Sequence, residues 1–119
     1  MRVLLVDDEQ ELVSTLAERL ALRGIEADWV ATADNALKIV ESEAYDLAVV
    51  DVKIPGINGI ELKRRMQKKR PNMKFIFMTG HGSEADYQAA SAEAGSQYYL
   101  AKPVKIGVLI EKMKEALKE

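Results

Sequence analysis

The sequence predicts a single α/β domain in which helices cover both faces of a five-stranded parallel sheet. Three observations lead to this fold class. Short apolar runs rich in β-branched residues recur, a segment with helical spacing follows each run, and no linker interrupts the alternation from Arg2 to about Lys118. Because alternating strands and helices build parallel sheets with helices on two faces, we expect a doubly wound α/β sandwich. A chain of 119 residues fits one such domain.

Five segments have the composition of strands. Three contain continuous apolar runs, which is typical of interior strands covered on both faces. The second carries Glu26 and Asp28 and therefore suits an edge of the sheet. In chain order, the predicted strands are Arg2–Val6, Ile25–Val30, Asp46–Val50, Lys74–Met78 and Ser96–Leu100.

Helical spacing is clearest after the first and the last of these strands. Each segment has one apolar stripe, formed by Leu12, Val13, Leu16, Ala17 and Leu20 in the first helix and by Ile106, Leu109, Ile110, Met113 and Leu117 in the last. Helix starts are predicted at Thr32, at Asn58, where Glu61 can return a capping bond, and at Ser83. The fourth helix, about Glu84–Glu93, presents mostly alanines, so we expect it to bury little area and to move most readily.

Composition excludes several classes of protein. Lys and Arg total 17 against 19 Asp and Glu, so the net charge of −2 gives no reason to expect a polyanionic partner. The absence of cysteine excludes disulfide and thiolate chemistry. The sequence contains no run of about 18 apolar residues, the length needed to span a bilayer. Asp7 ends the N-terminal apolar run before it is long enough for a signal peptide. We expect a cytoplasmic protein with no membrane partner.

Polar side chains follow four of the predicted strands where the strands end. Because the carboxyl ends of parallel strands meet at one edge, these residues should lie close together. Crowded carboxylates favour a hard divalent cation, and Mg²⁺ fits best because it can share its coordination with a phosphoryl group. A lysine and a hydroxyl can bind phosphoryl oxygens, and a carboxylate can attack phosphorus. The residues are Asp7-Asp8-Glu9, Asp51, Thr79 and Ala101-Lys102-Pro103.

These motifs carry a resemblance to a known family. Four motifs occur in order at the ends of the predicted strands: Val6-Asp7-Asp8-Glu9, the stretch DVKIPGING at 51–59, Thr79-Gly80 and Lys102-Pro103. Together they resemble the response regulator receiver domain of two-component signalling, of the CheY-like kind, over essentially all of residues 1–119. The resemblance implies a flavodoxin-like strand order 2-1-3-4-5 with five helices. It also implies a phosphoacceptor switch, which assists its own phosphorylation and dephosphorylation, rather than an enzyme.

The resemblance implies roles for the acids. Asp51 would accept a phosphoryl group from the phosphohistidine of a histidine kinase or phosphotransfer protein. Asp51 and Asp8 would bind Mg²⁺ directly, Asp7 would bind it through a water molecule, and the backbone carbonyl of Lys53 would complete the protein ligands.

The resemblance also implies how the signal leaves the site. Thr79 and Lys102 would bind the phosphoryl oxygens, and the Lys102–Pro103 peptide bond would be cis. Tyr99 falls at the family's switch position, where its ring would turn inward as Thr79 moves. Phosphorylation adds roughly two negative charges at Asp51. It would bias an existing conformational equilibrium of the loops and the fourth helix. The face made by helix four, strand five and helix five would then bind an output partner or a second copy of the domain.

Some residues have a second interpretation. Lys53 and His81 stand two residues after Asp51 and Thr79, positions that tune phosphoryl hydrolysis in the family, but both could equally be solvent-facing loop residues. The acids at 7–9 could be a helix turn favoured by the helix dipole.

Six of the 17 basic residues gather in the third helix, as Lys63-Arg64-Arg65 and Lys68-Lys69-Arg70. Since they run all round that helix without aromatics, a solvated face is favoured, and we expect no direct binding of nucleic acid.

Three other functions could use the same architecture. A Mg²⁺-dependent phosphatase of the haloacid-dehalogenase type usually has a second Asp two residues after the nucleophile, where this chain has Lys53. A nucleotide or flavin module needs a Gly-rich loop after the first strand, where acids stand instead. A degenerate receiver that only binds partners would not need the intact set of site residues. The phosphoacceptor switch is therefore the favoured hypothesis.

Overall fold

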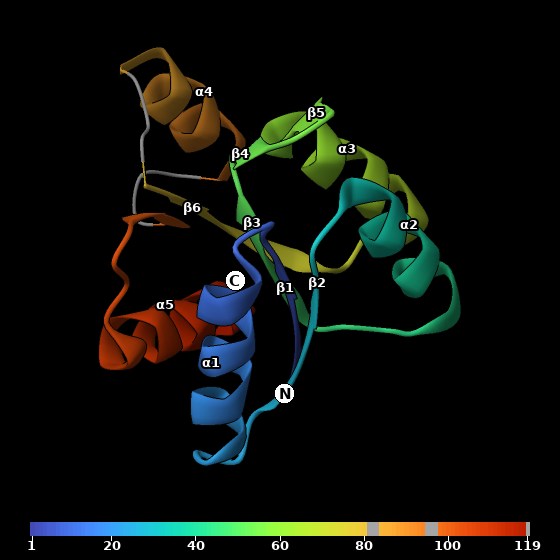
Figure 1. The fold of residues 1–119 in the computed structure, drawn as a ribbon. Helices are drawn as coiled ribbons and strands as arrows, with labels where there is room; N and C mark the ends of the chain where they lie inside the picture. Colours follow the sequence, from blue (N-terminus) through green and yellow to red (C-terminus); the bar gives the residue numbers. More distant parts are fainter. Residues whose placement is uncertain (81–83, 95–97, 119) are drawn as a thin grey trace.

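The computed structural model describes residues 1–80, 84–94 and 98–118, and it has the predicted α/β architecture (Figure 1). The strands are β1 (Arg2–Val6), β2 (Glu26–Val30), β3 (Leu47–Asp51), β4 (Lys53–Ile54), β5 (Ile57–Asn58), β6 (Lys74–Thr79) and β7 (Tyr99–Ala101). The helices are α1 (Gln10–Ala21), α2 (Ala33–Ser42), α3 (Gly59–Lys69), α4 (Glu84–Ala94) and α5 (Ile106–Lys118). Five parallel strands form the main sheet in the order β2-β1-β3-β6-β7, so the predicted order 2-1-3-4-5 is confirmed.

The hydrophobic core lies on both faces of this sheet. Helices α1 and α5 cover one face, where Leu5 and Val49 are fully buried, and α2, α3 and α4 cover the other, where Leu4 and Phe77 are fully buried (Figure 1). Successive side chains of a strand point to opposite faces, so apolar runs in β1, β3 and β6 feed both halves of the core. Among the described residues, no helix combines the length and the apolar character needed to cross a membrane.

Three strands, β3, β6 and β7, end one residue later than predicted, and in β3 and β6 the extension places a site residue on the sheet. The ladder between β3 and β6 includes the pair Asp51 and Met78, and the ladder between β6 and β7 includes the pair Thr79 and Ala101. Asp51 and Thr79 are therefore the last residues of strands, held by backbone pairing, and not the first residues of loops. The predicted start of the last strand, Ser96, lies outside the described residues.

A short hairpin between β3 and α3 was not predicted. Strands β4 and β5 pair antiparallel, with Ile54 opposite Ile57. The connection is Pro55-Gly56, and the φ of Gly56 is +89°, which matches a turn with Pro first and Gly second. That dipeptide is a known turn signal, so the sequence did contain evidence for the hairpin.

Helix ends follow the predicted caps in part. The Thr32 side chain accepts a hydrogen bond from Asn35 N, and the Asn58 side chain accepts one from Ile60 N. The expected return bond from Glu61 is not made, because its carboxylate accepts from the side chain of Arg65 instead. In α5 the predicted stripe is displaced at its end, where Ala116 is buried and Leu117 is exposed. The predicted helix start Ser83 lies outside the described residues.

The expectation of a fully solvated basic face on α3 is wrong at Lys63. Its side chain is only 10% exposed, and Nζ donates to Gln67 Oε1 (2.9 Å) and to Glu93 Oε2 of α4 (3.1 Å). Arg64 Nε donates to the other carboxylate oxygen of Glu93 at 2.9 Å. The hydrogen bond from Arg64 lowers the pKa of Glu93 below its ordinary value, despite the opposing effect of burial. Two basic residues of α3 therefore bind one acid of the alanine-rich α4, whose Ala90 is fully buried.

Glu93→Gln should loosen α4. The change leaves Lys63 buried without its counter-ion, which costs about 2 kcal/mol for a charged hydrogen bond. We expect faster amide hydrogen exchange in α4, with little change in β1. Because the pKa of Glu93 is lowered in the folded protein, its stabilisation is present above the ordinary pKa of 4.5 and is lost as the pH falls through the lowered value. Glu111→Gln, at an exposed glutamate of α5, is the control, and an equal effect there would contradict the α3–α4 role.

Candidate functional site

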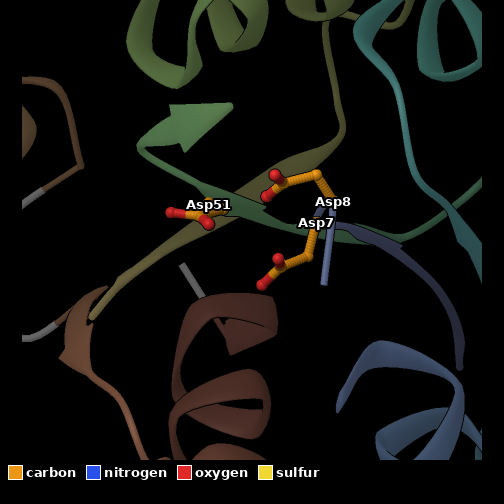
Figure 2. Close-up of side chains that lie close together, drawn as sticks. All are labelled: Asp7, Asp8 and Asp51. Carbon is orange, nitrogen blue, oxygen red and sulfur yellow. The ribbon is translucent and has the colours of Figure 1, made fainter. Parts of the chain in front are cut away.

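Three aspartates meet at the carboxyl edge of the sheet. Asp7 and Asp8 follow β1, and Asp51 is the last residue of the neighbouring β3. One carboxylate oxygen of each lies within 4.8 Å of one oxygen of both others. Figure 2 shows the three side chains gathered at this edge. Asp7 is fully buried, Asp51 is 4% exposed and Asp8 is exposed. The site is therefore open to solvent on the side of Asp8.

Backbone hydrogen bonds fix the two buried carboxylates. Asp7 Oδ1 accepts from Glu9 N at 2.9 Å, and Asp51 Oδ1 accepts from Lys53 N at 3.0 Å. In both cases the carboxylate binds the amide two residues later, a local turn that Asp side chains favour. The second oxygen of each aspartate, Oδ2, contacts the side chain of Lys102.

The ammonium of Lys102 contacts three carboxylates of the site. Its Nζ lies 2.7 Å from Asp7 Oδ2, 2.8 Å from Glu9 Oε1 and 3.1 Å from Asp51 Oδ2. Although burial lowers the pKa of Lys102, its contacts with the carboxylates of Asp7, Glu9 and Asp51 raise it well above its ordinary value, so the ammonium stays charged. The backbone N of Lys102 donates to Thr79 O at 2.9 Å, and the Lys102–Pro103 peptide bond is cis.

The site carries more acid than base, which is the condition that favours a divalent cation. Three carboxylates, from Asp7, Glu9 and Asp51, contact the ammonium of Lys102, and that of Asp8 lies within 4.8 Å of those of Asp7 and Asp51. Burial raises the pKa of Asp7, and although the neighbouring ammonium of Lys102 lowers it, the effect of burial is larger. Asp7 Oδ2 is fully buried, and its contact with Nζ lacks the angles of a hydrogen bond. Hard oxygen atoms in a cluster of this kind suit Mg²⁺.

The remaining predicted residues lie around this cluster. Thr79 is 4% exposed at the end of β6, next to β3, and Lys53 is exposed on β4. Tyr99 is partly buried against the core beneath α2, α3 and α4, and its ring meets that of Tyr87 of α4 edge to face, with centroids 5.2 Å apart. The neighbouring Tyr98 is buried on the opposite face. His81 lies outside the described residues.

Sequence reasoning missed one site residue, Glu9. Glu9 belongs to the acidic run after the first strand, but its position in the sequence indicates only that it follows Asp8. Its contact with Lys102 joins positions 93 residues apart. The signal that could have found it is the charge balance of the site, since a third acid beside a predicted lysine is a ready ion-pair partner.

Comparisons with known proteins give one consistent result. A family model described as the response regulator receiver domain matches residues 3–114. Sporulation initiation phosphotransferase F of Bacillus subtilis is 35% identical over 98% of this chain and 93% of that protein. Transcriptional regulatory protein TcrA of Mycobacterium tuberculosis is 32% identical over 96% of this chain, but the chain spans only 45% of TcrA.

Solved structures agree with these sequences. A CheY-like response regulator receiver domain protein from Methanospirillum hungatei superposes with a TM-score of 0.88 and is 38% identical, covering 98% of this chain and 93% of that chain. A Burkholderia pseudomallei response regulator with a phosphorylated aspartic acid, a calcium ion and citrate has a TM-score of 0.86 and is 26% identical, covering 98% of this chain and 68% of that one.

Proposed function

The chain belongs to the family of response regulator receiver domains of two-component systems, and we propose that Asp51 is its phosphoacceptor. Phosphoryl transfer to an aspartate is general in this family. The observation that carries the proposal is the convergence of Asp7, Asp8 and Lys102 on the Asp51 carboxylate. Asp51 is also the one of the three aspartates that ends a central strand, where backbone pairing holds it in place.

The transfer follows from the placement of the two Asp51 oxygens. Oδ1 is held by Lys53 N, and Oδ2, which faces Lys102, attacks the phosphorus of a phosphohistidine. The new O–P bond forms as the P–N bond breaks, and the bonding electrons stay on the imidazole nitrogen, which then binds a proton. Lys102 and Thr79 bind oxygens of the transferred group. A Mg²⁺ held by Asp7, Asp8, Asp51 and the backbone carbonyl of Lys53 would offset the negative charge.

The proposed response runs from Thr79 to the surface of α4. Thr79 ends β6 and pairs with Ala101 of β7, two residues from Tyr99. Tyr99 contacts Tyr87 of α4, so a movement of Thr79 toward the phosphoryl group can be passed to α4 through the two rings. The face formed by α4, β7 and α5 then presents a changed surface to an output partner or to a second copy of the domain.

Incubation with acetyl phosphate and Mg²⁺ tests the proposal. We expect intact-mass measurement to show one phosphoryl group per chain, and chelation of the metal to prevent its addition. The linkage formed should be stable in acid and labile in base, as that of an acyl phosphate is. If the protein instead hydrolyses many equivalents of a small phosphoester without retaining a phosphoryl group, a phosphatase is the better description.

Mg²⁺ alone should stabilise the protein. A ligand that binds only the folded state adds about 2.7 kcal/mol when its concentration is a hundred times its dissociation constant. Asp8→Asn should weaken this stabilisation, because it removes an exposed carboxylate without disturbing the buried ones. Thermal unfolding in MgCl₂, against NaCl of equal ionic strength, measures the effect. Asp34→Asn, an exposed acid of α2, is the control, and equal responses of the two variants would argue against the site.

The pH dependence has a defined sign. Because the pKa of Asp7 is raised in the folded protein, the folded state binds this proton more tightly than the unfolded state does. Without a divalent cation, the contribution of Asp7 to stability therefore falls as the pH rises from the ordinary value of 3.8 through the raised one. Mg²⁺ should reduce this loss, since it favours the ionised carboxylate.

A further inference from the structure

Glu9 differs from the other carboxylates that contact Lys102. The side chains of Asp7 and Asp51 are 0% and 6% exposed, whereas the side chain of Glu9 is 60% exposed. Glu9 stands at the N-cap of α1, and its backbone N donates to Asp7 Oδ1. The distance from Glu9 Oε1 to Lys102 Nζ is 2.8 Å, so this contact is made by a carboxylate that solvent can reach.

Three carboxylates contact the ammonium of Lys102, and Nζ donates hydrogen bonds to those of Glu9 and Asp51. An ammonium has three N–H groups, and three carboxylate oxygens lie within 3.1 Å of Nζ. Once Asp51 Oδ2 has formed its bond to phosphorus, it is a poor acceptor, and oxygens of the dianionic phosphoryl group take its place beside Nζ. These oxygens compete with the carboxylates of Asp7 and Glu9 for the three N–H groups of Lys102.

The acceptor that can leave at least cost is Glu9. If Lys102 left Asp7, a fully buried carboxylate would lose its cation, and Asp51 is the residue that carries the new group. The exposed Glu9 carboxylate can exchange Lys102 for water, because exposed ion pairs contribute little. We propose that Glu9 is a positioning residue that holds Lys102 before phosphorylation and is displaced by the phosphoryl group. This inference rests on the phosphoacceptor role of Asp51.

The proposal makes the Glu9 carboxylate a competitor of the phosphoryl group. Weakening its contact with Lys102 should raise the rate of phosphorylation at low acetyl phosphate concentration by about two- to fivefold, which corresponds to the strength of an exposed ion pair. The affinity of the Mg²⁺-saturated protein for beryllofluoride, a stable stand-in for the phosphoryl group, should rise by the same factor. A merely structural role of Glu9 would not strengthen binding.

Three variants distinguish the loss of the contact between Glu9 and Lys102 from the loss of a negative charge. Glu9→Gln removes the charge and keeps the length, whereas Glu9→Asp keeps the charge but is one methylene too short for the present contact. Glu11→Gln removes an exposed acid two residues away in the first turn of α1 and is the matched control. None of these changes removes the backbone bond from residue 9 to Asp7.

Phosphorylation rates against acetyl phosphate concentration, and calorimetry with beryllofluoride, decide the outcome. We expect both Glu9 variants to exceed the wild type and Glu11→Gln to match it. If Glu9→Gln matches Glu11→Gln, or if Glu9→Asp matches the wild type, displacement of Glu9 is ruled out and general repulsion of the anion remains. Failure of the wild type itself to take up a phosphoryl group would instead overturn the role of Asp51, and the proposal for Glu9 with it.

Discussion

Asp51→Asn should abolish phosphorylation by acetyl phosphate, with no phosphoryl group detected by intact mass after an incubation that labels the wild type fully. The amide oxygen of asparagine is a poor nucleophile and carries no charge to share with a cation, so both proposed functions of the side chain are lost. The effect is all or none because no other described carboxylate lies on a central strand beside Lys102 in the same way.

The same variant should remain folded. Asp51→Asn removes one of three carboxylates that contact the ammonium of Lys102, and an asparagine oxygen can still accept the hydrogen bond from Lys53 N. We therefore expect its free energy of unfolding, measured without divalent cations, to equal or exceed that of the wild type. Functional sites often trade stability for activity in this way. Asp34→Asn should be labelled as the wild type is, and a phosphoryl group that persisted in Asp51→Asn would mean that another residue is the acceptor.

The fold and the acidic site could be predicted because the signals were local. Continuous apolar runs such as residues 3–6 mark buried parallel strands, and the acids directly after them must reach the carboxyl edge of the sheet. Three strands end one residue later than predicted, and at two of these ends the extra residue is polar, Asp51 and Thr79. A polar residue ends an apolar run in the sequence, but it does not end backbone pairing with the neighbouring strand.

The parts that could not be predicted depend on partners that are distant in the chain. Lys63 looks like one member of a solvated basic run until Glu93 is brought beside it across 30 residues. Glu9 likewise looks like a spare acid until the end of β7 brings Lys102 to it. Long charged side chains leave no periodic pattern of this kind, because their methylene chains can bridge positions that no repeat relates.

Gly59→Ala should be strongly destabilising, by about 3 kcal/mol, the upper part of the range for overpacking. A Cβ at this position would lie 2.2 Å from the backbone O of Asp51 and 2.8 Å from Val52 Cα. Those atoms cannot easily move away. Gly59 N donates to Val52 O at 2.8 Å, and Val52 N donates to Met78 O at 2.9 Å, so the segment is bonded on both sides.

Gly107→Ala is the matched control, because a Cβ there would meet nothing within 4 Å inside α5. Alanine is the better helix former by up to about 1 kcal/mol, so this variant should unfold at the same or a higher denaturant concentration than the wild type. Gly59→Ala should unfold at a clearly lower one, and phosphorylation should also slow, since the clash displaces the backbone that positions the Asp51 carboxylate. If the two alanine variants were equally stable, the close approach of α3 to the end of β3 would not constrain the site. The first turn of α3 would then be free to move independently of Asp51.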